Sequence, residues 1–89
     1  MASIGYSENF LNKRADVLSD RTLSQIDCML RTIEFMPGVG SSLVSESLTS
    51  RYGSDILKVL VSPYLILYRY DRDTDTVSVY DLVYAPSVH

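Results

Sequence analysis

The sequence has few residues that could cross-link the chain or hold a metal ion. Its 89 residues include one cysteine, Cys28, and one histidine, His89. A single cysteine excludes an internal disulfide framework, and with one histidine it excludes a Cys/His zinc site within one chain. We expect Cys28 to be a small buried residue rather than a nucleophile, because no histidine lies within reach to activate it.

Cofactor motifs are also missing. The glycine-containing loop at residues 38–42 lacks the spacing and the lysine of a phosphate-binding loop. Asp71, Asp73 and Asp75 alternate as calcium ligands would, but the central glycine and distal glutamate of an EF-hand loop are absent, which favours a solvated hairpin turn. We therefore predict neither a cofactor nor a metal site.

Long apolar runs and a basic charge excess are absent. No run reaches the ~18 residues of a membrane span, and the N-terminus lacks the charged and apolar regions of a signal peptide, so we expect a cytoplasmic protein without a membrane partner. Eleven acidic and eight basic residues give a net charge of -3, which argues against binding nucleic acid mainly by long-range attraction to phosphate. Without repeats or linkers, residues 1–89 should form a single domain.

The chain is organised around residues 56–84. This stretch contains three runs rich in Val, Ile, Leu and Tyr, separated by Ser62-Pro63 and by the polar cluster at residues 71–75. β-Branched and aromatic side chains favour strands, and Pro and Asp interrupt them. We predict a three-stranded antiparallel meander.

Two helices are predicted before the meander. Ser7 and Ser19 are suitable N-cap residues, and Pro37-Gly38 ends the second helix. The connection between the helices is short, so they should form an antiparallel hairpin. The side chains expected in the core are Phe10, Leu11, Ala15 and Leu18 in the first helix, and Leu23, Ile26, Met29, Leu30, Ile33 and Met36 in the second. Residues 2–6 are predicted as a short edge strand, and residues 45–52 as a short helix ended by Gly53.

Alternation along the predicted strands divides their side chains between two faces. With turns at residues 62–63 and 71–75, Lys58 should lie opposite Leu67, and Leu67 opposite Val79. One face then carries Leu57, Val59, Val61, Tyr64, Ile66, Tyr68, Tyr70, Tyr80, Leu82 and Tyr84. The other carries Ile56, Lys58, Leu60, Leu65, Leu67, Arg69, Val77, Val79, Asp81 and Val83. Both faces are largely apolar and two helices can cover only one, so we predict that a partner covers the second.

The order of these elements resembles the RelE/ParE toxins of bacterial type II toxin–antitoxin modules. The likeness rests on a short strand, a helical hairpin ending at Met36-Pro37-Gly38, a strand from Ser62 to Arg69, an acidic turn, and a last strand ending at Leu82-Val83-Tyr84. It implies an α+β fold, with an N-terminal short strand and an α-helical hairpin packed on one face of an antiparallel β-meander. It also implies a toxin neutralised by a cognate antitoxin, whose C-terminal segment folds onto it.

The family divides by target. RelE-like members cleave messenger RNA in the ribosome with basic groups that neutralise phosphate and assist proton transfer, whereas ParE-like members poison DNA gyrase. Lys58 matches a basic position of the RelE-like pattern, but Leu65 and Ala85 stand where further basic residues are expected. The remaining catalytic candidates are Lys58, Arg69, Tyr84 and Arg51. Losing a transition-state cation costs roughly 10²-fold or more in rate, so gyrase-directed, growth-inhibiting action is favoured over mRNA cleavage.

The second face supplies the predicted partner-binding residues. These are Ile56, Lys58, Leu65, Leu67, Arg69 and Val79. The alternative for the two basic residues is that they are solubilising charges whose stems cover apolar surface. The expected partners are a cognate antitoxin and, as cellular target, DNA gyrase or the ribosome. A further alternative is a non-toxic homologue that buries the second face in a homodimer.

Overall fold

The computed structural model describes residues 2–42 and 44–86. His89 therefore lies outside the described residues. Along the chain the elements are β1 (Ser3–Tyr6), α1 (Glu8–Ala15), α2 (Asp20–Phe35), the 3₁₀ helix η1 (Pro37–Val39), α3 (Glu46–Tyr52), β2 (Leu57–Val61), β3 (Tyr64–Asp71) and β4 (Thr76–Tyr84). No helix in this part of the chain is long and apolar enough to cross a membrane.

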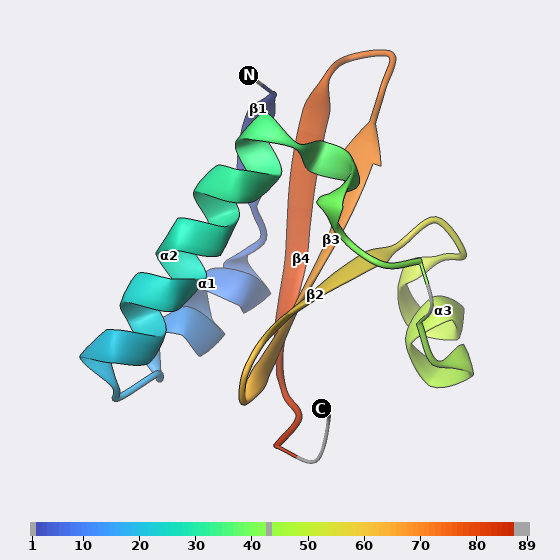
Figure 1. Cartoon of the computed structure of the whole chain (residues 1–89). Helices are drawn as coiled ribbons and strands as arrows, with labels where there is room; N and C mark the ends of the chain where they lie inside the picture. Colours follow the sequence, from blue (N-terminus) through green and yellow to red (C-terminus); the bar gives the residue numbers. More distant parts are fainter. Residues whose placement is uncertain (1, 43, 87–89) are drawn as a thin grey trace.

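The four strands form one mixed sheet in the order β1-β4-β3-β2. β2, β3 and β4 are the predicted antiparallel meander, so this part of the expected α+β fold is confirmed. β1 pairs in parallel with β4, with Ser3 opposite Thr76 and Tyr6 opposite Val79. β1 and β2 are thus the two edge strands, as Figure 1 shows.

The two long helices begin at the predicted caps. The Ser7 hydroxyl accepts a hydrogen bond of 3.0 Å from the Phe10 backbone N–H, and the Ser19 hydroxyl accepts one of 3.2 Å from Thr22. Each bond satisfies one of the backbone donors that a helix N-terminus leaves without an intrahelical partner. α1 and α2 follow one another after a short connection and lie on one side of the sheet (Figure 1).

The main core lies between the helical hairpin and the sheet. From the helices and their connection this core takes Phe10, Val17, Ile26, Leu30 and Ile33, and from the strands Val61, Ile66, Tyr68, Val77, Val79 and Leu82. Not every helix side chain expected in the core is buried, since Leu11, Leu18 and Met36 are exposed. Cys28 is exposed as well, so the expectation that it is buried was wrong.

A β-bulge changes the predicted register of the last hairpin. Lys58 pairs with Leu67 as predicted, but Leu67 pairs with Asp81 rather than with Val79. Val79 instead pairs with Tyr68, and Tyr80 is the extra residue between the two pairs. Beyond an extra residue, the odd-numbered and even-numbered positions of a strand exchange faces. The face predicted for Val79 was therefore wrong, and this valine is buried in the helix-side core.

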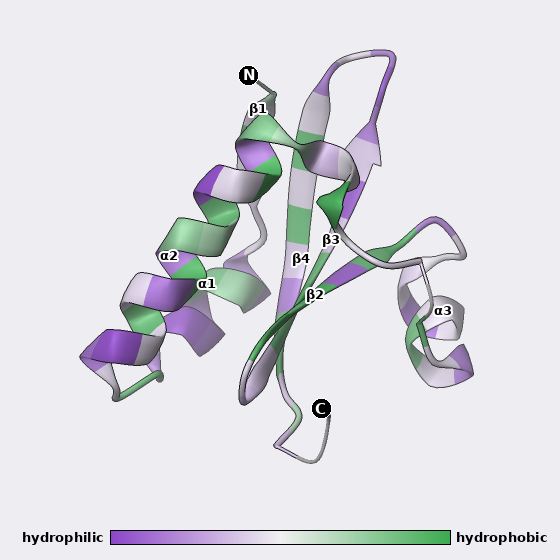
Figure 2. Cartoon of the chain, in the orientation of Figure 1, coloured by the Kyte–Doolittle hydropathy of each residue, from purple (hydrophilic) through white to green (hydrophobic). Residues whose placement is uncertain are grey.

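The second face of the sheet is not bare. α3 lies on the side of the sheet opposite to α1 and α2 (Figure 1). Ile56 and Leu67 are 0% exposed and Leu65 is 7% exposed. The prediction that a partner must cover this face was thus wrong for its central residues, because the chain itself covers them. Leu60, at 39% exposure, remains open, and β2 is mostly hydrophobic in Figure 2.

Candidate functional site

Four side chains form a continuous stack on the second face. The Arg51 guanidinium carbon lies 5.4 Å from the centre of the Tyr52 ring, at the end of α3. The Tyr52 ring lies 6.1 Å from the Tyr80 ring at an angle of 20°. The Arg69 guanidinium carbon lies 5.9 Å from the Tyr80 ring. These distances suit aromatic stacking and cation–π attraction, so the cationic stack of Arg51, Tyr52, Tyr80 and Arg69 joins α3 to β3 and β4.

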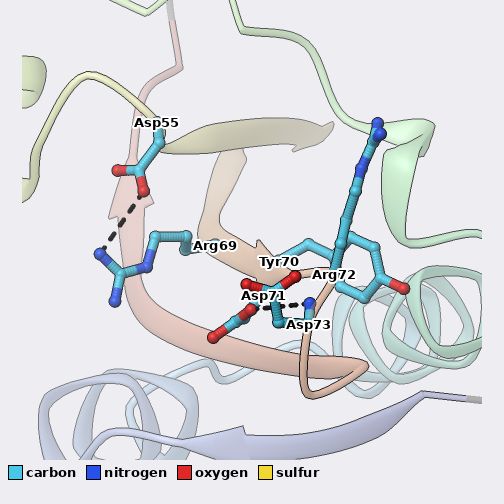
Figure 3. A pocket seen from close by; sticks show the side chains of 6 residues that line it. All are labelled: Asp55, Arg69, Tyr70, Asp71, Arg72 and Asp73. Carbon is cyan, nitrogen blue, oxygen red and sulfur yellow. Dashed lines mark hydrogen bonds and ion pairs between the residues drawn. The ribbon is translucent and has the colours of Figure 1, made fainter.

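Arg69 is partly neutralised at the outer end of this stack. Its Nη1 lies 3.5 Å from Oδ2 of Asp55, and both side chains are exposed (Figure 3). Such a pair contributes little to stability, but it lowers the local positive charge. The turn beyond Arg69 adds acids, and Asp71 accepts a 3.0 Å hydrogen bond from the Asp73 backbone N–H. The surroundings of Arg69 are therefore acidic on two sides.

Lys58 lies in a row that crosses three strands. It pairs with Leu67 of β3, which in turn pairs with Asp81 of β4. Its backbone exchanges two hydrogen bonds of 2.9 Å with Ser41, which bridges to the outer edge of β2. Because Arg69 is two residues beyond Leu67 on the same strand, Lys58 and Arg69 are diagonal neighbours on one face.

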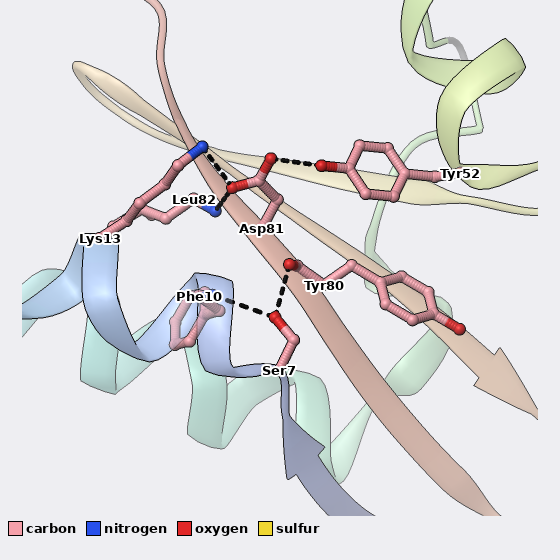
Figure 4. A network of polar contacts seen from close by, with 7 residues as sticks. All are labelled: Ser7, Phe10, Lys13, Tyr52, Tyr80, Asp81 and Leu82. Atoms are coloured by element: carbon pink, nitrogen blue, oxygen red, sulfur yellow. Dashed lines mark hydrogen bonds and ion pairs between the residues drawn. The ribbon is translucent and has the colours of Figure 1, made fainter.

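Asp81 is a buried carboxylate, 1% exposed, that connects both sides of the sheet. Its Oδ1 accepts a 2.7 Å hydrogen bond from Lys13 Nζ of α1, and its Oδ2 accepts one of 2.6 Å from the Tyr52 hydroxyl of α3 (Figure 4). The Leu82 backbone N–H adds a third bond of 2.8 Å. A buried charge without such partners would be costly. Asp81 therefore fixes helices of both layers to one strand.

The hydrogen bonds at Asp81 outweigh the effect of its burial. Burial raises the pKa of this carboxyl, whereas the hydrogen bonds from Lys13 and Tyr52 and the positive charge of Lys13 lower it. The net pKa of Asp81 lies below its ordinary value of 3.8. For Tyr52, burial and the hydrogen bond to Asp81 both raise the pKa of the phenol. The pair is therefore a neutral donor and a charged acceptor at neutral pH.

Ser7, at the start of α1, forms hydrogen bonds to the backbone of the bulge in β4. The Ser7 hydroxyl donates a 2.6 Å hydrogen bond to the Tyr80 carbonyl while it caps Phe10 (Figure 4). The Ser7 backbone N–H donates to the Val79 carbonyl at 2.9 Å. One N-cap residue thus sets the helix start and the position of the bulge together.

Tyr84 lies apart from the basic candidates. It pairs with Tyr64, and the two rings make an edge contact at 5.5 Å. Tyr64 packs against the helix-side core, and Tyr84 borders a pocket with Lys13 of α1. Lys58 and Arg69 therefore share the second face, whereas Tyr84 belongs to the other. Arg51 is joined to Arg69 through the stack on the second face. The four predicted catalytic candidates therefore do not converge on one point.

The predicted partner-binding residues are divided in the same way. Ile56, Leu65 and Leu67 are buried on the second face, and Val79 is buried under the helices. Lys58 and Arg69 are the members of this set whose side chains reach the surface. The sequence interpretation also missed Tyr52, Asp81 and Lys13. An aspartate inside an apolar strand was the available signal, because a buried acid needs partners.

A separate groove lies between α2 and the outer edge of β2. It has a volume of about 540 Å³ and is lined by Gln25, Cys28, Met29, Thr32, Leu60, Val61 and Ser62. Outward-facing and inward-facing backbone groups alternate along a strand, and those of Lys58 face outward to Ser41. The N–H and C=O of Leu60 then also face outward, and no backbone group among the described residues bonds to them. This edge can accept another strand.

The geometry defines an α+β protein with a helical hairpin on one sheet face and a short helix on the other. No family model and no curated protein matches the sequence. The fold is similar to the crystal structure of the isolated E. coli RelE toxin, with a TM-score of 0.75 and 14% identity over 100% of this chain and 89% of that one. It is also similar to the intact E. coli RelBE toxin–antitoxin complex, with a TM-score of 0.71 and 18% identity over 96% of this chain and 98% of that one. The chain has a RelE-like fold, and the fold predicted from the sequence is confirmed.

Proposed function

We propose that this protein is the toxin of a toxin–antitoxin pair. The observation that carries the proposal is the likeness to the RelE toxin over the whole chain, together with the likeness to a RelBE toxin–antitoxin complex. A fold can host many functions. The proposal therefore needs a surface for an antitoxin and a test in cells.

The open part of the β2 edge at Leu60 and the groove beside it are suited to a peptide antitoxin. An extended segment could bond to the Leu60 backbone and place apolar side chains against Met29. Main-chain hydrogen bonds provide affinity in this binding mode, and the flanking groove provides specificity. The buried residues of the second face are not available for this purpose while the chain covers them.

Expression in a bacterial host tests the proposal. We expect growth arrest on induction and recovery when the protein encoded by the adjacent gene is co-expressed. Leu60→Glu should keep the arrest but weaken the rescue, because a charge in the groove opposes an apolar segment. Leu18→Glu is the matched control, since Leu18 is 96% exposed on the α1–α2 connection. Harmless expression of the folded chain would exclude a toxin and leave the homodimeric, non-toxic alternative, which sedimentation can test.

For the mode of action we propose growth inhibition without RNA cleavage, as in gyrase-directed members of the fold. Phosphate-ester cleavage needs charged groups that converge where charge develops. Here Tyr84 lies on the opposite face from Lys58, and Arg69 is paired with Asp55. Leu65, which stands where a further basic group was expected, is buried.

Ribosome-dependent cleavage of messenger RNA is the second candidate function. One reason for it is that both similar structures contain RelE. The other is that Lys58 and Arg69 lie on the same face of the sheet. Sequencing of transcript ends during growth arrest separates the two modes. Cleavage of translated messages that disappears in Lys58→Ala or Arg69→Ala would establish the ribonuclease and exclude the gyrase-directed mode. Intact messages together with inhibited DNA supercoiling by purified gyrase would establish the opposite.

A further inference from the structure

A short segment covers the second face with few attachments of its own. We define the cover as residues 44–55, which contain α3. α3 contributes no buried residue, and the described hydrogen bonds within the cover are local, such as Gly53 N–H to the Thr49 carbonyl at 2.8 Å. Its contacts with the sheet are concentrated at the stack on Tyr80 and the Tyr52 hydroxyl bond to Asp81. The exposed Arg69–Asp55 pair adds little to these.

The central residues of the second face, which we assign to the area under the cover, are as buried as those of the main core. Leu67 is 0% exposed on the second face, and its strand neighbour Ile66 is 0% exposed on the helix side. Ile66 lies under two long helices that contribute several fully buried residues. Leu67 lies beside Asp81 in register, on the face to which Tyr52 is attached. Equal burial on the two faces is therefore maintained by covers of very different size.

A conformational joint lies near the end of the cover. Gly53 has φ of 106°, a region that residues with a side chain rarely adopt, and it directly follows α3. Beyond it, Ile56 is fully buried and β2 begins at Leu57. A change at Gly53 can move α3 without altering the pairing of β2, because β2 is held by β3 and by the Ser41 bridge.

We propose that residues 44–55 form a hinged cover that leaves the second face while the sheet and the helical hairpin stay folded. Tyr52 is the latch, because its ring and its hydroxyl make the principal contacts with β4. Opening exposes Leu67 and Leu65 beside Lys58, which creates the apolar face with a cationic border that the closed form lacks. The proposed function supplies only the reason for uncovering this face, and the opening itself is independent of toxicity.

Thiol labelling of buried cysteines measures the opening directly. Cys28→Ser provides a background without cysteine, since Cys28 is the one cysteine of the sequence. In that background we compare Leu67→Cys with Ile66→Cys, which are adjacent on β3, equally buried, and on opposite faces. Labelling of Leu67→Cys should be at least about ten-fold faster, because local opening requires less free energy than global unfolding. Equal labelling rates, both matching the global unfolding rate, would overturn the proposal.

The latch is tested by removing one hydroxyl. Tyr52→Phe should accelerate the labelling of Leu67→Cys by about ten-fold, the effect of losing one hydrogen bond to a charged acceptor. Labelling of Ile66→Cys should change much less. Tyr84→Phe is the control, because Tyr84 is 63% exposed on the other face. An equal acceleration at both reporter cysteines would show global destabilisation and refute the latch. If Leu67→Cys does not fold, Leu65→Cys reports on the same face.

None of these measurements depends on growth arrest or on a partner. A harmless protein whose Leu67→Cys labels quickly would retain the cover and lose the proposed function. A toxic protein whose two reporter cysteines label equally slowly would retain the function and lose the cover. The two proposals can therefore fail separately.

Discussion

Replacing Asp81 by alanine should destabilise the protein more than any other change of an acidic residue in the described part of the chain. The substitution removes one carboxylate that accepts from Lys13 at 2.7 Å, from Tyr52 at 2.6 Å and from the Leu82 N–H at 2.8 Å. It also leaves a small void, because Asp81 is 1% exposed. Three interactions that join α1, β4 and α3 are lost together.

The magnitude follows from what happens to each abandoned donor. Removing one member of a fully buried ion pair costs about 3–5 kcal/mol. The Lys13 side chain is 43% exposed, so its ammonium can return to water and the cost is smaller. Hydrogen bonds to charged groups contribute about 1.5–3 kcal/mol each, and the remaining loss falls on Tyr52 and the Leu82 amide. We expect a decrease of about 2–4 kcal/mol in the free energy of unfolding, a large part of the about 5–13 kcal/mol typical of a domain of this size.

Urea unfolding followed by circular dichroism provides the measurement. Asp27→Ala is the matched control, because Asp27 also pairs with a cation, Arg14 at 2.8 Å, but both side chains are well exposed. That control should cost less than about 1 kcal/mol. A double-mutant cycle of Asp81→Ala with Tyr52→Phe should give a coupling of about 1 kcal/mol or more. If Asp81→Ala were no more costly than Asp27→Ala, the role assigned to the buried carboxylate would be refuted.

Three further changes test the same structure. The pKa of Asp81 is lowered on folding, so its contribution to stability is full above the unfolded pKa of about 4 and is lost as the pH falls through the folded value. The difference between the urea midpoints at pH 7 and pH 3 should therefore be smaller in Asp81→Asn than in the unmodified protein. Gly40→Ala should lower the melting temperature, because an added Cβ would lie 2.6 Å from the Tyr68 hydroxyl, whereas Gly38→Ala, with nothing within 4 Å, should change it little; equal shifts would contradict the close approach. Tyr68→Phe should lower the free energy of unfolding by about 1–3 kcal/mol, because this buried hydroxyl donates to the Pro37 carbonyl at 2.7 Å and accepts from the Gly40 N–H at 2.9 Å. An unchanged free energy in urea unfolding would show that water replaces the hydroxyl.

Local signals in the sequence predicted the elements well. Ser7, Ser19 and Gly53 mark helix ends through the conformations and hydrogen bonds that such positions require, and the structure places helix boundaries at all three. The turn at Ser62-Pro63 fixed the register of β2 against β3 for the same reason. These features depend on neighbours in the sequence, so no tertiary information is needed.

Non-local features could not be predicted in the same way. The bulge at Tyr80 depends on Ser7, which is 73 positions away and holds the Tyr80 carbonyl. The parallel pairing of β1 joins the two ends of the chain. Because the bulge was missed, Val79 was assigned to the second face. The contacts of Asp81 were not foreseen because its partners, Lys13 and Tyr52, come from distant helices. The cover over Leu67 was missed because a seven-residue helix gave no sign of where it would pack.

The single extra residue in β4 also constrains how this strand can vary. On its N-terminal side, odd-numbered positions such as Val77 and Val79 serve the helices, and on its C-terminal side Leu82, an even-numbered position, does so. Deleting Tyr80 would leave Val79 opposite Tyr68 and Asp81 opposite Leu67 in a regular ladder, whereas deleting a paired residue such as Ser78 would move the side chains on one side of it to the wrong face. Insertions and deletions should therefore be tolerated in the turn at residues 72–75, and deletion of Tyr80 should remove chiefly its stack on Tyr52 and its bond from Ser7. The number of paired residues in β4, by contrast, is as strictly determined as the identity of its buried residues.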